Sequence, residues 1–164
     1  WEHWQAPAAE LRIHAAPSQH FSGRSLRDRN ATLWSSLVIE TPRHRVFFSG
    51  DTGLTPEYAR IREHFGGFDL VLLEVGAHHP AWGDIHLGPE NALKALQLLG
   101  GGTLLPVHWG TFSLALHDWD EPAEVLLDCF SFKVTNSSAM VGWTAQVASH
   151  CALVRPALTA MAAS

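Results

Sequence analysis

The sequence predicts an α/β layered fold. Apolar runs typical of strands alternate with amphipathic stretches typical of helices, and polar residues directly follow several of the predicted strands. The chain has 164 residues, of which 46% are hydrophobic and 16% charged, so it can bury the core of one domain. We therefore expect functional side chains along one edge of a sheet.

The first three predicted strands cover residues 10–15, 32–40 and 45–48. The first alternates weakly between apolar and polar residues, and the other two are rich in β-branched and aromatic residues. Residues 41–44, Thr-Pro-Arg-His, predict a hairpin connection between the second and third strands.

Two helices are predicted after these strands. The first covers residues 55–65, with a proline at an early position and glycines at its end. The second covers residues 88–99, where leucines recur on one side before a run of three glycines.

Two further strands are expected to be buried. Residues 69–75 are nearly all apolar and predict a central strand covered on both faces, and residues 103–107 predict another short buried strand. The loop between residues 76 and 87 is rich in histidine and aspartate, which favours an active-site loop. Residues 131–134 predict one more strand, and residues 141–163 are too polar for a membrane span.

Composition restricts the partners and the compartment. The formal net charge is −5 and lysines and arginines form no evident stripe, so we do not expect nucleic acid as a partner. The two cysteines and the absence of a leader-like opening predict a cytoplasmic protein, in solution or at a membrane surface. Eleven histidines exceed what structure alone requires and indicate metal binding.

Three residues stand where strands are predicted to end. His20 follows the first predicted strand, Asp51 follows the third, and His108 follows residues 103–107. Two imidazoles and a carboxylate suit zinc or iron, and a carboxylate can bridge two ions about 4 Å apart. His78, His79, His117 and His150 are expected to be ordinary surface or loop histidines.

The order of several motifs resembles the N-acyl-phosphatidylethanolamine-hydrolysing phospholipase D branch of the metallo-β-lactamase superfamily. The motifs extend over residues 1–128 and comprise Pro17-Ser18-Gln19-His20-Phe21-Ser22-Gly23-Arg24, Asp28-Arg29-Asn30, Phe47-Phe48-Ser49-Gly50-Asp51-Thr52-Gly53, His86 with Pro89-Glu90-Asn91-Ala92, and His108-Trp109-Gly110-Thr111-Phe112. The resemblance implies the second half of a four-layer αββα sandwich. Residues 129–164 are then a divergent C-terminal tail.

The resemblance also implies a function. His20 and His108 would be terminal ligands of different metals, Asp51 would bridge them and help hold a nucleophilic hydroxide, and His86 would contact the substrate. The ions would be two zincs, with iron or manganese as alternatives. The reaction would be hydrolysis of a small-molecule or lipid phosphodiester, with lactones and other esters as alternatives. Arg24, Asp28 and Asn30 would support the loop that carries His20.

One family motif, His-x-His-x-Asp-His, does not occur in this sequence. We therefore expect the C-terminal half of the sandwich, with a sheet face left for the N-terminal half or a second copy to cover. A non-catalytic scaffold or interaction fragment of the same fold is an alternative. A less favoured alternative is an aspartic protease using Asp51-Thr52-Gly53, since such enzymes are mostly β and need two copies of the motif.

Overall fold

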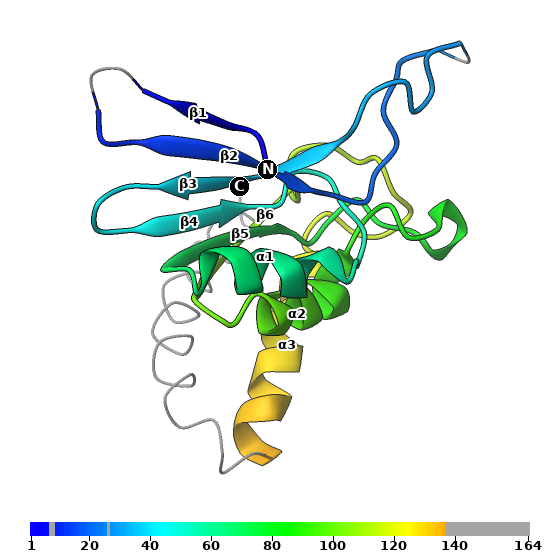
Figure 1. Cartoon of the computed structure of the whole chain (residues 1–164). Helices are drawn as coiled ribbons and strands as arrows, with labels where there is room; N and C mark the ends of the chain where they lie inside the picture. Colours follow the sequence, from blue (N-terminus) through cyan, green and yellow to red (C-terminus); the bar gives the residue numbers. More distant parts are fainter. Residues whose placement is uncertain (7–8, 26, 137–164) are drawn as a thin grey trace.

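The computed structural model describes residues 1–6, 9–25 and 27–136, with side chains described as far as residue 129. Six strands form one sheet in the order β1-β2-β3-β4-β5-β6, helices α1 and α2 pack on one of its faces, and α3 packs against α2 (Figure 1). The predicted α/β class is confirmed. The elements are β1 (His3–Gln5), β2 (Arg12–Pro17), β3 (Ser35–Glu40), β4 (Arg45–Phe48), α1 (Glu57–Phe65), β5 (Leu70–Glu74), the 3-10 helix η1 (Pro80–Trp82), α2 (Gly88–Leu98), β6 (Thr103–Val107) and α3 (Glu121–Asn136).

The sheet is antiparallel at one side and parallel at the other. Strands β1 to β4 pair antiparallel, and the predicted hairpin at residues 41–44 connects β3 to β4. Strands β4, β5 and β6 pair parallel, since helices α1 and α2 provide the crossovers that parallel neighbours require. Because β3 is antiparallel to both β2 and β4, the strands β2, β4, β5 and β6 all run in one direction.

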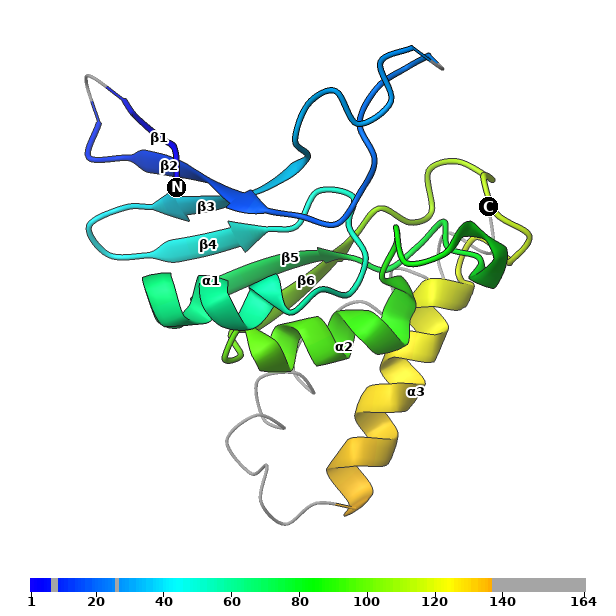
Figure 2. The same cartoon turned by 45° about the vertical axis from the view of Figure 1, so that its right-hand side comes forward.

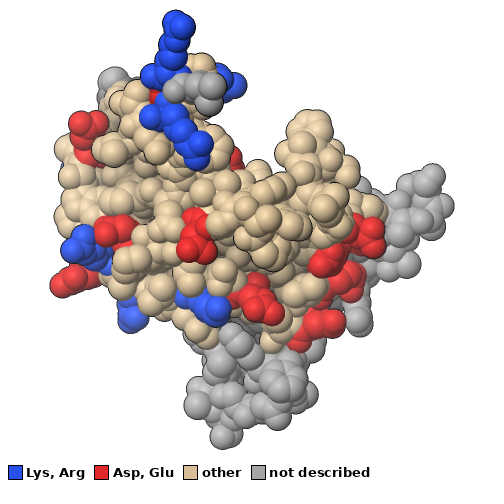
Figure 3. All heavy atoms as spheres, turned by 90° about the vertical axis from the view of Figure 1, so that its right-hand side faces the viewer, with Lys and Arg blue, Asp and Glu red and all other residues tan. Residues whose placement is uncertain are grey.

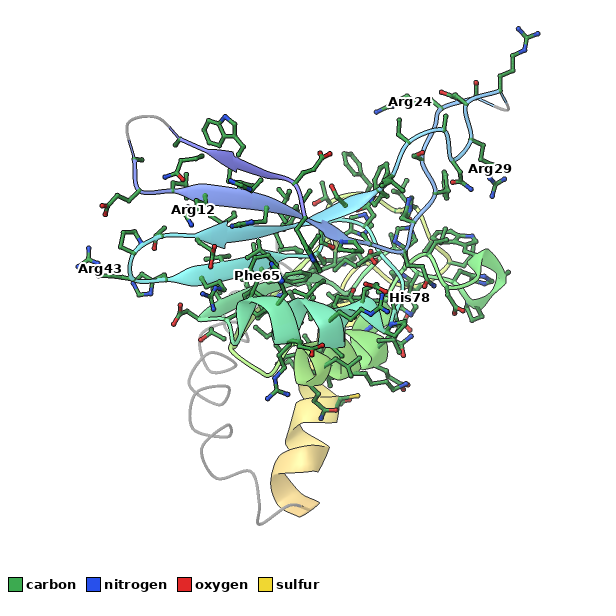
Figure 4. All side chains as sticks on the ribbon, in the orientation of Figure 1. Arg12, Arg24, Arg29, Arg43, Phe65 and His78 are labelled. Atoms are coloured by element: carbon green, nitrogen blue, oxygen red, sulfur yellow. The ribbon has the colours of Figure 1, made fainter. Side chains whose placement is uncertain are left out.

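The core lies between the sheet and helices α1 and α2, and Figure 2 shows both helices against the same face. Phe47 of β4 and Leu73 of β5 are fully buried there against Ile61 of α1. Phe65 closes α1 beside the sheet (Figure 4). Removing these apolar side chains from water is the main stabilising contribution to this layer.

The opposite face of the sheet remains partly open. Leu72 of β5 is only half-buried, and its neighbours in register, Phe48 and Leu105, are 36% and 46% exposed. The prediction that β5 is covered on both faces is therefore wrong. The prediction of a buried β6 is wrong as well, because none of its residues is fully buried, and among the described residues no strand pairs with its outer edge. The apolar sequences of β5 and β6 place apolar side chains on a sheet face that the described part of the chain leaves uncovered.

The C-terminal helix corrects a further prediction. Residues 131–134, predicted as a strand, lie inside α3. The helix starts at Glu121 and Pro122. Each residue added to an existing helix gains a hydrogen bond at little cost, which outweighs the weak strand signal of four residues. Helix α3 runs through residue 128 without a break. The predictions for residues 137–164, His150 included, lie outside the described residues.

Two smaller findings complete the fold. Strand β1 has three residues, too few to show the alternation that identifies strands in a sequence. Within the described part of the chain, none of the helices combines the length and apolar character needed to cross a membrane.

Candidate metal centre

The strand directions bring four site residues to one edge of the sheet. His20 follows β2, Asp51 follows β4, Glu74 ends β5 and His108 follows β6 directly. These four strands run the same way, so their C-terminal ends meet at the same edge. His86 joins them from the loop before α2.

Each predicted site residue lies close to at least one of the others. His108 Nε2 is 3.5 Å from Asp51 Oδ1. The His86 ring stacks on the His108 ring with centroids 5.3 Å apart, and it meets the His20 ring edge-on at 5.2 Å. The structure therefore brings together all four residues that the sequence singled out.

Backbone carbonyls orient two of these imidazoles. His20 Nδ1 lies 2.7 Å from the carbonyl oxygen of Phe21, and His108 Nδ1 lies 3.1 Å from that of Gly76. A carbonyl only accepts hydrogen bonds, so each Nδ1 donates in these contacts, and Nε2 is the nitrogen of each ring that can act as a metal ligand. An imidazole held in this way is ready to bind a metal through Nε2.

Glycines and a strained residue allow the close packing of the site loops. A Cβ on Gly76 would lie 2.6 Å from the carbonyl oxygen of His108, and one on Gly53 would lie 1.8 Å from that of Asp84. His108 itself has a φ of 65°, which is uncommon outside glycine and costs energy that surrounding contacts must offset. This backbone conformation places the His108 ring in the site at the end of β6.

Glu74 is a site residue that sequence reasoning missed. It is 0% exposed, and it forms with His86 and His108 the group of possible metal-binding side chains found in the described residues. In the sequence, the feature that could have identified Glu74 is its position as a carboxylate near the end of the largely apolar segment Asp-Leu-Val-Leu-Leu-Glu-Val. Buried carboxylates are rare unless they have partners, so a glutamate that ends an apolar strand is a candidate site residue.

The charges around His86 favour its protonated form. Burial alone would lower the pKa of His86, but the hydrogen bond from its ring to Glu74 and the negative charges of Glu74 and Asp51 outweigh burial and raise the pKa above its ordinary value. An imidazolium at this position can donate hydrogen bonds from both nitrogens.

His78 differs from the prediction of an ordinary surface histidine. It is half-buried, its Nδ1 has no hydrogen-bond partner among the described residues, and its ring lies 5.0 Å from that of His117. Burial and then the nearby His117 lower the pKa of His78. His78 lies at the base of the projecting loops (Figure 4). By contrast, His79 is an exposed loop residue whose Nδ1 accepts the N–H of Ala81.

The residues predicted to support the His20 loop act on its backbone. Asp28 accepts the N–H groups of Ser25 and Arg24 at 2.7 and 3.2 Å, and the hydrogen bonds, led by that from the Ser25 hydroxyl, lower its pKa. Asn30 accepts the N–H of Ser22. The Arg24 side chain lies on the projecting loop, away from the sheet (Figure 4). Figure 3 shows basic side chains gathered at that loop and acidic ones lower on the same face.

An apolar pocket adjoins His108. It has a volume of about 190 Å³ and is lined by Trp109, Phe112, Leu114 and Trp119, among others. A much wider open depression borders His20 and Trp34. The pocket beside His108 is therefore mainly apolar, whereas the depression beside His20 is lined by both polar and apolar side chains.

Comparisons with known proteins identify the family of the chain. A family model described as the beta-lactamase superfamily domain matches residues 1–109. An uncharacterised protein of Mycobacterium tuberculosis is 50% identical over 125 residues, which are 74% of this chain and 33% of that protein. The mitochondrial N-acyl-phosphatidylethanolamine-hydrolysing phospholipase D of Saccharomyces cerevisiae is 40% identical over 119 residues, which are 70% of this chain and 25% of the enzyme.

A solved structure shows the same fold. The metallo hydrolase of the archaeon Ignicoccus hospitalis superposes with a TM-score of 0.59 at 24% identity, over 79% of this chain and 51% of that one. The chain spans about a third of the length of its mycobacterial relative. The matched family model, the curated relatives and the shared fold show that the chain belongs to the metallo-β-lactamase superfamily.

Proposed function

We propose that this chain supplies part of the active site of a metal-dependent phosphodiesterase, with His20, Asp51 and His108 as metal ligands. The observation that carries the proposal is the 3.5 Å separation of His108 Nε2 and Asp51 Oδ1. Two ligand atoms each about 2.1 Å from a tetrahedral zinc ion lie about 3.4 Å apart. The donor atoms present therefore fit a zinc ion, with iron or manganese as alternatives.

The chain's own residues define the remaining roles. A bound ion would supply a water with a lowered pKa and would polarise the bond to be cleaved. Asp51, 37% exposed at its side chain, faces the site and would hold that water in place through its carboxylate. His86, whose raised pKa favours the imidazolium, would donate a hydrogen bond from Nε2 to a substrate oxygen as negative charge develops on it.

The substrate class follows from the surroundings of the site. The pocket of Trp109, Phe112 and Trp119 beside His108 suits an apolar group attached to the scissile bond. The yeast relative is named for hydrolysis of an N-acylated phospholipid, which supports a lipid or small-molecule phosphodiester as the substrate. Lactones and other esters are the alternative within the same mechanism.

Two other functions receive less support. The aspartic-protease alternative needs Asp51 to face a second carboxylate of the same kind, whereas Asp51 lies against His108. The non-catalytic alternative rests on the absence of His-x-His-x-Asp-His from the sequence. The oriented imidazoles favour the metal site, because a scaffold does not require free Nε2 atoms.

The partner and the compartment are part of the proposal. The open sheet face, with Phe48 and Leu105, would be covered by an N-terminal half of the sandwich or by a second copy of the chain. We place the protein in the cytoplasm, on the basis of its two cysteines.

The direct test is the zinc content of the purified chain, measured by mass spectrometry beside hydrolysis of a chromogenic phosphodiester. We expect bound zinc, and turnover that a chelator removes and zinc restores. His108→Ala should lose zinc and lower turnover at least about a hundredfold, because a metal ligand is lost. His44→Ala, in the exposed β3–β4 turn, is the matched control and should change neither. A wild-type chain without zinc and without turnover would favour the non-catalytic alternative.

A further inference from the structure

The buried carboxylate of Glu74 lies at the centre of the site without facing the solvent. It ends β5, between β4 and β6, and its side chain is 0% exposed. Taking an ionised carboxylate out of water costs several kcal/mol unless hydrogen bonds satisfy its oxygens. The partners of its two oxygens therefore indicate why it is there.

One carboxylate oxygen holds two backbone segments. Glu74 Oε1 accepts the N–H of Thr52 at 2.8 Å and the N–H of Leu87 at 3.1 Å. Thr52 follows Asp51 in the chain, and Leu87 follows His86. The oxygen thus fixes the positions of two of the proposed site residues through the peptide groups next to them.

The other oxygen holds imidazoles. Glu74 Oε2 lies 2.7 Å from His86 Nδ1 and 3.3 Å from His108 Nδ1. The His108 Nδ1 proton is also directed to the carbonyl of Gly76, so His86 has the shorter and stronger contact with Glu74. A carboxylate beside Nδ1 keeps the proton on that nitrogen and leaves Nε2 to face the site.

These contacts argue against Glu74 as a metal ligand. Glu74, His86 and His108 offer ligand atoms within 4.8 Å of one another, which would permit a site formed by the three. However, both oxygens of Glu74 already accept hydrogen bonds, and the Nδ1 atoms that face it already have carbonyl or carboxylate partners. An ion there would have to break most of these bonds.

We propose that Glu74 is a positioning residue, which holds Asp51, His86 and His108 in register and fixes the Nδ1–H form of His86. The expected effect of Glu74 on metal binding rests on the proposed function, whereas its effect on the positions of the three residues and on the His86 tautomer does not. One buried side chain links the loops after β4 and β5 and the end of β6, so the ligand positions would depend on it jointly.

The test compares the full wild-type chain with Glu74→Gln, a substitution of nearly equal size. The amide oxygen of glutamine can still accept the N–H groups of Thr52 and Leu87, but its NH₂ group would then face the Nδ1–H of His86. Two donors cannot bond, so His86 should move its proton to Nε2 or turn away. Long-range ¹H–¹⁵N spectra of the imidazoles, recorded without metal at alkaline pH, report this tautomer, and a His86→Gln spectrum identifies the His86 signals.

The expected result has two parts. Wild-type His86 should show the Nδ1–H form, and Glu74→Gln should remove it. Zinc affinity, measured by chelator competition, should fall by about 10- to 100-fold, as is usual when a partner that orients a metal ligand is lost. Glu63→Gln, exposed on α1, is the matched control and should leave both unchanged.

Other outcomes would overturn the proposal. Wild-type His86 in the Nε2–H form, or an unchanged tautomer and zinc affinity in Glu74→Gln, would exclude a positioning role. Loss of one zinc ion with an unchanged His86 tautomer would show that Glu74 is itself a ligand. If Glu74→Gln does not fold, the tautomer of His86 in the wild-type chain still tests the proposal. Glu74→Asp provides a second variant, because its shorter side chain withdraws the carboxylate and should also weaken zinc binding. A wild-type chain that binds no zinc would favour the non-catalytic alternative to the proposed function, whereas the tautomer measurement would still test Glu74.

Discussion

At the scale of single residues, the site depends on backbone geometry as much as on the ligands. His108 adopts a left-handed backbone conformation directly after β6, and its carbonyl lies against Gly76. A side chain at position 76 would occupy the space that the His108 and Trp109 backbone now fills. The requirement for glycine there is therefore steric.

Gly76→Ala tests this steric requirement. The new Cβ would lie 2.6 Å from the His108 carbonyl oxygen and 2.7 Å from the Trp109 Cβ, closer than folded proteins tolerate. We expect a loss of about 1–3 kcal/mol in the free energy of unfolding, measured with urea, together with weaker zinc binding as His108 is displaced.

Gly67→Ala is the control for the same substitution. A Cβ at Gly67 would have no atom within 4 Å, and this glycine follows α1, away from the site edge. Its unfolding free energy should stay within about 0.5 kcal/mol of wild type. Equal effects of the two variants would refute a steric role for Gly76.

At the scale of elements, a cluster of charges ties β3 to its neighbours. Glu40 of β3 accepts hydrogen bonds from Arg45 of β4 at 2.9 Å and from His14 of β2 at 2.8 Å. Burial acts to raise the pKa of Glu40, but the hydrogen bonds and charges of Arg45 and His14 outweigh it, and the net effect lowers the pKa. The cluster therefore joins three strands at the end of the sheet opposite the metal site.

The lowered pKa of Glu40 predicts a pH dependence of stability. A carboxylate with a lower pKa in the folded state stabilises the fold above its unfolded pKa of about 4.3, and this contribution is lost as the pH falls through the folded-state value. Glu40→Gln should cost up to about 1 kcal/mol in unfolding free energy at neutral pH. Its difference from wild type should disappear in acid.

Urea unfolding across this pH range provides the measurement. Glu10→Gln, exposed before β2, is the control and should follow the wild-type curve. A Glu40→Gln difference that persists unchanged below the folded-state pKa would contradict the assignment, because an uncharged Glu40 would then have the same effect.

At the scale of the whole molecule, the two faces of the sheet differ. Helices α1 and α2 cover one face, and the other presents Phe48 and Leu105. Apolar surface of this kind favours association with a complementary partner. A second copy is the partner available in a purified sample.

Leu105→Glu tests whether this face drives association. Sedimentation velocity over a range of concentrations should show self-association of the wild-type chain, and the buried charge should weaken it at least about tenfold. Leu98→Glu, on the exposed side of α2, is the control and should associate as wild type does. A wild-type chain that stays monomeric at every concentration would show that the face is stable without a second copy.

The sequence by itself determined most elements and four of the site residues. Local signals sufficed for the hairpin at residues 41–44, for α1 and for α2, because turn residues and apolar periodicity act within a few residues. His20, Asp51 and His108 were identified because metal-ligating side chains stand in family motifs at predicted strand ends, and His86 was identified from its family motif in the loop before the second predicted helix. The structure brings these four together, and their roles remain predictions.

Only the tertiary structure decided how strands and charges are partnered. The exposure of β6 and of one face of β5 depends on which elements pack beside them. An apolar run in the sequence does not show which elements those are. The same holds for Glu74, whose partners Thr52, His86 and Leu87 are at least a dozen residues away in the chain. The role of a buried carboxylate depends on the groups that folding brings into contact with it. Those contacts are determined by the packing of the whole sheet edge.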